Sequence, residues 1–268
     1  MLLTYNVLSS ASLSEMLFFV VKMKNDFETP ISLVLLPALN EEEGIGVTIS
    51  ELKECLNGLH QAYFLVVDGN SKDRTVEVAK SLGAEVVAQT GKGKGNAIEC
   101  ALNYVNHDNI RYIILSDADH TYPAQYVPEM IELLDDDPRI GMVCGNRFNS
   151  NLPCVTGGYM FFLGNKLLSF FHSLLNGVNL NDPLTGLRVI RWSALKDWKP
   201  RSKSFDIEVE LNHYIEQQKF LIKEIDIPYR ERLGTKKLKI RHGLIIMDRI
   251  FKEALGSVNQ KFFRGEIV

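Results

Sequence analysis

The sequence of 268 residues lacks any run of apolar residues long enough to cross a bilayer. A membrane-spanning helix needs about 18 or more such residues in a row, and the longest candidates here are Met16–Val21 and Ile31–Leu39. No basic residue precedes the first of these runs, so the N-terminal segment is also a poor secretory signal peptide. We expect residues 1–28 to be an appendage outside the fold.

Cysteine is scarce, and positive charge is not in excess. The four cysteines form no CxxC pair, which excludes a zinc ribbon and gives no sign of a disulfide framework. Their scatter favours a cytoplasmic protein in which reduced thiols pack as small core residues. The net charge of −3 provides no basic field for nucleic acid, so no nucleic-acid partner is expected.

Two phosphate-binding motifs are also missing. The P-loop spacing GxxxxGK[ST] does not occur, and no GxGxxG follows the first apolar run, which argues against P-loop hydrolases and dinucleotide-dependent dehydrogenases. The chain is 46% hydrophobic and 24% charged, as expected of an ordinary folded protein. Its length suits one large α/β domain with tails.

Short apolar runs alternate with stretches of helical spacing along the chain. Strands are predicted at Ile31–Leu36, Phe64–Val67, Glu85–Ala88, Tyr112–Leu115, Ile140–Cys144, Leu187–Ile190 and Leu221–Ile227. Helices are predicted around Ile49, Leu52 and Leu56 and at Asp73–Leu82, Gly95–Val105, Ala124–Leu134, Gly158–Leu175, Phe205–Gln217 and Leu244–Leu255. Continuous apolar strands between helices predict an α/β fold whose mainly parallel central sheet has helices on both faces.

Polar clusters follow four of the predicted strands, where an open α/β sheet binds its ligands. They begin at Pro37, Asp68, Asp117 and Gly145. Each cluster alone is explained as a capped turn, since residues such as Asp73 are good helix N-caps. Their joint placement favours one shared crevice.

The segment Asp117-Ala-Asp119 carries the clearest chemistry. Two carboxylates at a strand end repel each other unless a cation sits beside them, and their hard oxygen atoms suit Mg²⁺ or Mn²⁺. A metal-bound diphosphate is a good leaving group, because the metal offsets the developing charge. The segment Gly91-Lys-Gly-Lys-Gly95 precedes a helix and would approach phosphates.

Seven motifs in order resemble the family 2 glycosyltransferases of the GT-A fold. Five of them are Pro37-Ala-Leu-Asn-Glu-Glu-Glu, Val67-Asp-Gly-Asn-Ser-Lys-Asp-Arg-Thr75, Gly91-Lys-Gly-Lys-Gly-Asn-Ala97, Asp117-Ala-Asp119 and Gly145-Asn-Arg147. The last two, Asp182-Pro-Leu-Thr-Gly-Leu-Arg188 and Tyr229-Arg-Glu-Arg-Leu-Gly-Thr-Lys-Lys-Leu238, resemble the branch of polyprenyl- or dolichyl-phosphate glucose and mannose synthases. The resemblance implies a transferase domain over residues 29–243, followed by an amphipathic tail over residues 244–268.

The resemblance also implies site residues. The nucleotide would contact Pro37, Leu39, Glu41, Asp68, Lys94 and Asp117. Asp117 and Asp119 would hold the metal and the sugar diphosphate, and the phosphate and acceptor contacts would come from Arg147, Arg232 and Lys237. The catalytic set would be Asp117, Asp119, Arg147 and Arg232.

The acceptor decides which further chemistry is needed. A hydroxyl acceptor needs a general base, for which Asp206 and Glu210 are candidates at i, i+4 spacing, whereas a phosphate acceptor needs positive charge. The basic run Arg230–Arg241 favours phosphate over a merely solvated face. We therefore expect an inverting enzyme that moves a hexose from a nucleotide-diphospho-sugar to polyprenyl or dolichyl phosphate, for protein or surface glycosylation. The alternatives are a small soluble acceptor, such as a phosphoglycerate or a saccharide, and an inactive scaffold that binds sugar nucleotides.

A lipid acceptor implies contact with a membrane. The segment Gly158–Leu175 is rich in Phe and Leu and is interrupted by Asn165-Lys166, so that core packing and an interfacial helix are both open. We expect a cytoplasmic protein, peripheral at the inner face of the membrane.

Overall fold

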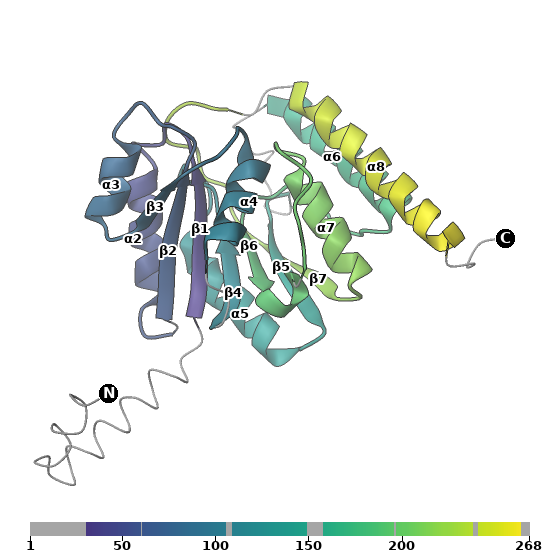
Figure 1. Ribbon diagram of the computed structural model, residues 1–268, viewed down its shortest axis with the longest axis horizontal. Helices are drawn as coiled ribbons and strands as arrows, with labels where there is room; N and C mark the ends of the chain where they lie inside the picture. The colour runs from purple at the N-terminus through teal and green to yellow at the C-terminus, as the bar shows by residue number, and fades with distance from the viewer. Residues whose placement is uncertain are drawn as a thin grey trace, which may run out of the picture.

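The computed structural model describes residues 31–59, 61–105, 109–148, 158–195, 197–237 and 241–263. Seven strands form one sheet in the order β3-β2-β1-β4-β6-β5-β7 (Figure 1). The strands are β1 (Ile31–Ala38), β2 (Gln61–Asp68), β3 (Glu85–Ala88), β4 (Ile110–Leu115), β5 (Ile140–Asn146), β6 (Arg188–Arg191) and β7 (Leu221–Asp226). The helices are α2 (Ile45–Leu56), α3 (Thr75–Ser81), α4 (Lys94–Tyr104), α5 (Val127–Asp136), α6 (Gly158–Asn176), α7 (Ile207–Gln217) and α8 (Arg241–Phe263), with 3₁₀ turns η1 (Ala124–Tyr126) and η2 (Trp192–Leu195).

The sheet is mainly parallel. β1 pairs in parallel with β2 and β4, β2 with β3, and β5 with β7. The exception is β6, which lies antiparallel between β4 and β5. The predicted α/β fold is confirmed, and the reversed direction of β6 is a feature that strand patterning alone does not contain.

Both faces of the sheet are covered by helices, as predicted. Along β1, Val34 and Leu36 join a core that includes apolar side chains of α2 and α5, whereas Leu33 and Leu35 join a core with side chains of α4 and α7. A strand buried on both faces is apolar at nearly every position, which explains the apolar run that marks β1, with the buried Ser32 as its exception.

Helices α6 and α8 lie side by side at one end of the molecule (Figure 1). They share a small core with α7, in which Leu168, Val209, Ile246 and Ile250 are buried. The last helix begins at Arg241, three residues before the start predicted from spacing. Within the described ranges, no helix is long and apolar enough to cross a membrane.

Three cysteines, Cys55, Cys100 and Cys144, are free thiols. Cys144 is fully buried, and burial raises the pKa of its thiol to about 12, so it packs as an inert core residue. Cys154 and the expected appendage at 1–28 lie outside the described residues. The domain boundaries at 29 and 243 stay predictions.

Candidate active site

A cavity of about 640 Å³ lies at the carboxyl ends of the central strands, where an α/β sheet binds its ligands. It falls within the range of small-ligand sites. Nine of the predicted site residues line it: Pro37, Leu39, Glu41, Lys94, Asp117, Asp119, Arg147, Arg232 and Lys237. Segments that follow β1, β4, β5 and β7 therefore meet at one place. The polar strand ends predicted this for β1, β4 and β5, whereas the predicted cluster that begins at Asp68 after β2 does not line the cavity.

The two aspartates are positioned by the end of β4. The strand stops at Leu115, and the chain turns so that Thr121 donates to Oδ1 of Asp119 from its backbone N–H (3.2 Å) and its hydroxyl (2.6 Å). Two glycines leave room for this turn. A Cβ at Gly44 would lie 2.7 Å from Cα of Asp119, and one at Gly186 would lie 2.5 Å from Oδ2 of Asp117. Both positions are therefore restricted to glycine by close packing around the carboxylates.

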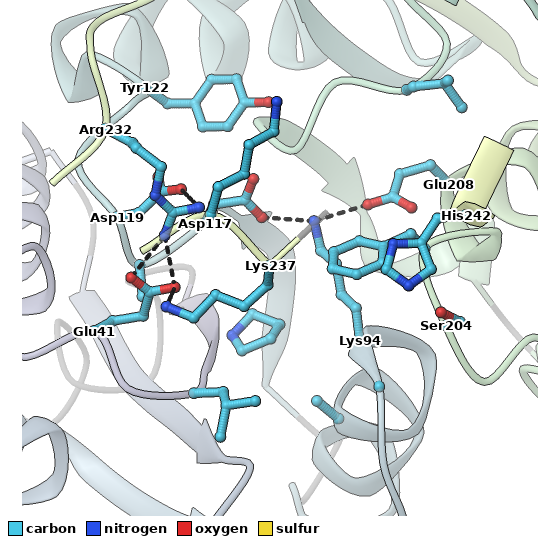
Figure 2. A pocket seen from close by; sticks show the side chains of 18 of the residues that line it. Glu41, Lys94, Asp117, Asp119, Tyr122, Ser204, Glu208, Arg232, Lys237 and His242 are labelled. Carbon is cyan, nitrogen blue, oxygen red and sulfur yellow. Dashed lines mark hydrogen bonds and ion pairs between the residues drawn. The ribbon is translucent and has the colours of Figure 1, made fainter. Parts of the chain in front are cut away.

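Lys94 is buried between two carboxylates. It opens α4, and its ammonium lies 2.6 Å from Asp117 and 2.7 Å from Glu208 (Figure 2). Burial opposes the charge of Lys94, but the two carboxylates outweigh it and raise its pKa. Burial likewise opposes ionisation of Asp117, and the charge of Lys94 outweighs it and lowers the pKa of Asp117. Lys94 and Asp117 therefore form a buried ion pair, and the carboxylate of Glu208 contacts the same ammonium.

A second charged cluster joins the end of β1 to the segment after β7. The guanidinium of Arg232 donates to both oxygens of Glu41 (3.0 and 2.9 Å) and lies 3.4 Å from Asp119. The ammonium of Lys237 lies 2.7 Å from Glu41 and donates to the backbone carbonyl of Asn40 (Figure 2). Burial and the nearby charge of Asp117 raise the pKa of Asp119. Arg232 therefore sits against carboxylates from two strand ends.

Arg147 is held in place by the fully buried carboxylate of Asp182. Its guanidinium makes two hydrogen bonds to Asp182, of 2.6 and 2.7 Å, and its backbone N–H makes a third. The guanidinium also lies over the ring of Tyr229, 5.2 Å from the ring centroid. Arg147 lines the cavity with its charge balanced by Asp182, which is a partner that sequence reasoning missed.

Glu208 is the main site residue that sequence reasoning missed. The prediction singled out Asp206 and Glu210, but neither lines the cavity. Asp206 accepts a hydrogen bond from Arg249, and Glu210 accepts from the backbone N–H groups of Arg201 and Ser202. Successive helical residues are about 100° apart, so residue 208 lies on the other side of α7 from 206 and 210. The spacing separates Glu208 from the other two acids, but only the tertiary structure shows that the side with Glu208 faces the cavity.

Asp68 lies beside the cavity without lining it. Its carboxylate accepts hydrogen bonds from the backbone N–H groups of Asn70 (3.1 Å) and Ser71 (3.2 Å), which closes the turn after β2. Asp73 accepts a hydrogen bond from the N–H of Thr75 in the same way. These contacts agree with the capped turn considered from sequence. A contact between Asp68 and the base stays a prediction. Gln89, Tyr122 and Tyr229 line the cavity and were not predicted.

The donor set at Asp117 and Asp119 suits a hard divalent cation. The part of the chain that the structure describes contains no cluster of three or more His, Cys, Asp or Glu side chains arranged around a metal. Two carboxylates in one cavity are nevertheless what Mg²⁺ uses when phosphate and water complete its coordination. The residues present therefore fit Mg²⁺ or Mn²⁺ bound together with a phosphorylated ligand.

Comparisons with known proteins show the family to which the chain belongs. The sequence profile of the family described as "Glycosyl transferase family 2" matches residues 33–198. A dolichyl-phosphate hexose transferase of Haloferax volcanii is 31% identical over 207 residues, which cover 76% of this chain and 85% of that protein. Glycosyltransferase AglJ of the same organism is 32% identical over 242 residues, which cover 87% of this chain and 75% of that protein.

The structural comparison shows the fold. Glucosyl-3-phosphoglycerate synthase of Mycobacterium tuberculosis, solved with Mn²⁺, uridine diphosphate and phosphoglyceric acid, aligns with a TM-score of 0.67 at 20% identity. The alignment covers 85% of this chain and 79% of that one. The predicted GT-A fold is thus confirmed, and the family profile spans more than half of the chain. This protein is a glycosyltransferase, and it belongs to glycosyl transferase family 2.

Proposed function

We propose that the protein transfers a hexose, with inversion at the anomeric carbon, from a nucleotide-diphospho-sugar to dolichyl or polyprenyl phosphate. One observation carries the choice of acceptor. Each carboxylate that lines the cavity in the described structure has an ion-pair partner: Lys94 for Asp117 and Glu208, Arg232 for Glu41 and Asp119. A paired carboxylate is a poor general base, and a phosphate acceptor needs none because it is already an anion.

The donor would occupy the side of the cavity formed by β1 and β4. Pro37, Leu39 and Glu41 would contact the nucleotide, and Lys94 would hold Asp117 in its ionised state. A divalent ion held by Asp117 and Asp119 would offset the charge that develops on the leaving nucleoside diphosphate.

The acceptor would occupy the side formed by Arg147 and the segment after β7. Arg232 and Lys237 would attract its phosphate, and an apolar flank containing Phe148, Phe162 and Ile246 suits an isoprenoid chain. A phosphate oxygen would attack the anomeric carbon from the face opposite the diphosphate. One C–O bond forms as another breaks, and no proton has to be removed.

Two further features support this assignment. The relative from Haloferax volcanii is named a dolichyl-phosphate hexose transferase, and it is more similar in sequence than the structural neighbour solved with phosphoglyceric acid. The intact pair Asp117 and Asp119 speaks against an inactive scaffold. We place the enzyme in the cytoplasm, peripheral at the inner face of the membrane, and serving protein or surface glycosylation.

The test is a matrix of donors and acceptors. Purified protein is assayed with uridine- and guanosine-diphosphate hexoses against a short polyprenyl phosphate, 3-phosphoglycerate and a free saccharide, with and without Mn²⁺. We expect product only on the polyprenyl phosphate and only with the metal. Transfer to 3-phosphoglycerate or a saccharide instead would refute the proposed acceptor.

A further inference from the structure

Helix α6 carries a stripe of exposed apolar side chains. Leu163, Leu167, Phe170 and Leu174 are each between 51% and 64% exposed. Their spacing of four, three and four residues places them on one face of the helix. The opposite face is buried, with Leu168 in the core shared with α7 and α8. The stripe is therefore not needed for packing within the described chain.

Helix α8 extends this apolar surface. Leu244, Phe251 and Leu255 are exposed, and Phe251 is 47% exposed. One ring contact joins the two helices, with the centroids of Phe171 and Phe251 6.5 Å apart, and Phe171 also contacts Phe170 on α6, with centroids 5.6 Å apart. The two stripes form one patch, which we call the α6–α8 face. A contiguous exposed patch of this kind marks an interaction site.

The charges around the α6–α8 face are unlike those of the whole chain, whose net charge is −3. Helix α6 contains no acidic residue. On α8, Asp248 pairs with Lys252, and Glu253 is buried against Arg201 and Arg249. No carboxylate of these two helices is thus left unpaired within the residues that the structure describes. The face therefore presents no unpaired negative charge that would repel an anionic surface.

The α6–α8 face adjoins the cavity. Phe162, next to Leu163 on α6, lines the cavity, as do Arg241, His242 and Ile246 at the start of α8. Figure 2 shows His242 on the same side of the cavity as Glu208 and Ser204. The exposed apolar surface therefore begins where the apolar flank of the cavity ends.

We infer that the α6–α8 face docks on the interface of an anionic phospholipid bilayer. Its leucine and phenylalanine side chains enter the boundary between headgroups and acyl chains, while the exposed Arg241 meets anionic headgroups. This arrangement holds the cavity at the membrane surface, where a polyprenyl phosphate presents its phosphate. The last step rests on the proposed function, whereas the docking itself rests on the surface alone.

The experiment measures binding to vesicles of phosphatidylcholine, with and without phosphatidylglycerol, by flotation. The test variant is Leu167→Gln/Phe170→Gln, and the matched control is Leu59→Gln, which changes an exposed leucine outside both helices. We expect the full chain to bind the mixed vesicles more tightly than the neutral ones. The double variant should bind roughly tenfold or more weakly, since it loses two half-exposed side chains that would be buried in the bilayer. The control should bind like the unchanged protein.

Activity on a short polyprenyl phosphate dissolved in detergent is measured in parallel. Loss of vesicle binding in the double variant, with this activity retained, supports the docking face. If the double variant loses vesicle binding and the unchanged protein does not act on polyprenyl phosphate, the docking face is supported and the proposed acceptor is wrong. The inference is wrong if the unchanged protein is active but does not bind vesicles. It is also wrong if the double variant binds vesicles as tightly as the control variant. The inference is also wrong if the unchanged protein forms a dimer that the double variant, but not the control variant, disrupts. A second copy of the chain would then cover the face.

Discussion

The ammonium of Lys94 lies 2.7 Å from the carboxylate of Glu208, and both groups are almost completely shielded from solvent. This contact ties the start of α4 to the start of α7 across the cavity. Since Lys94 also contacts Asp117, Glu208 acts on the predicted metal site through a second residue.

Glu208 is therefore expected to be a positioning residue. Glu208→Gln removes one charge-assisted contact of Lys94, worth about 1.5–3 kcal/mol, so kcat should fall roughly 10- to 150-fold with little change in the KM for the acceptor. The control is Glu99→Gln, whose carboxylate pairs with Lys203 on the surface and should contribute little. Steady-state kinetics of both variants measure this effect. If Glu208→Gln were as active as Glu99→Gln, Glu208 would have no positioning role.

The carboxylate pair is expected to be indispensable. Asp119→Ala should lower transfer at least roughly 100-fold, because it removes a ligand for the ion that offsets charge on the diphosphate. Chelation of divalent metal should have the same effect on the unchanged enzyme, and added Mn²⁺ should restore it. Asp136→Ala, at the exposed end of α5, serves as the control. An enzyme that works equally well in chelator would contradict the metal role.

Substitutions of Arg232 and Lys237 should show whether the acceptor is a phosphate. Arg232→Ala and Lys237→Ala should each weaken use of a polyprenyl phosphate about 10- to 150-fold at saturating donor. Arg232→Lys should rescue only in part, because lysine lacks the planar fork whose Nη2 contacts Glu41 while its Nη1 faces Asp119. Initial rates at varied acceptor concentration measure this effect.

The substitutions Asp206→Asn and Glu210→Gln test the alternative, a hydroxyl acceptor with a carboxylate base. Both carboxylates are buried against arginines or backbone N–H groups outside the cavity, so their loss should lower the free energy of unfolding more than turnover. If either change instead lowered turnover roughly 100-fold or more in a well-folded enzyme, a hydroxyl acceptor with a carboxylate base would be favoured.

Stability should fall in acid because of a buried histidine. Burial, aided by the charge of His213, lowers the pKa of His172 to about 3, whereas the same group titrates near 6.5 in an unfolded chain. The stabilising effect is complete above about pH 6.5 and is lost progressively as pH falls toward about 3, since only the unfolded state takes up the proton. The slope from this one group is about 1.4 kcal/mol per pH unit.

His172→Gln should remove that slope. Urea unfolding at about pH 7 and about pH 5 gives the free energy of unfolding for both proteins, and the difference between the two pH values should be smaller in the variant. Identical pH dependence would show that His172 is not the responsible group.

Much of the fold and half of the site were predictable from local sequence. A strand segment buried on both faces is mostly apolar, so Leu33–Leu36 of β1 and Tyr112–Leu115 of β4 stood out as continuous runs. Parallel strands present their carboxyl ends at one edge, so the polar segments at Glu41, Asp117 and Arg147 were expected to meet, and they do. These are consequences of backbone geometry over a few residues.

The tertiary structure determined which charged side chains of the site pair with one another. Arg147 faces Asp182, Glu41 faces Arg232, and Lys94 faces Glu208, and in each pair the two residues come from different segments of the chain. The sequence by itself determined the strands, the order of the motifs and the Asp117-Ala-Asp119 pair, because strand patterning and motif spacing are local properties of the chain. Only the tertiary contact of Glu208 with Lys94 selected Glu208 over Asp206 and Glu210, and only the pairing of α6 with α8 joined two separate apolar stripes into one face. Such choices depend on which surfaces come into contact, and contacts between distant segments are not encoded in local periodicity.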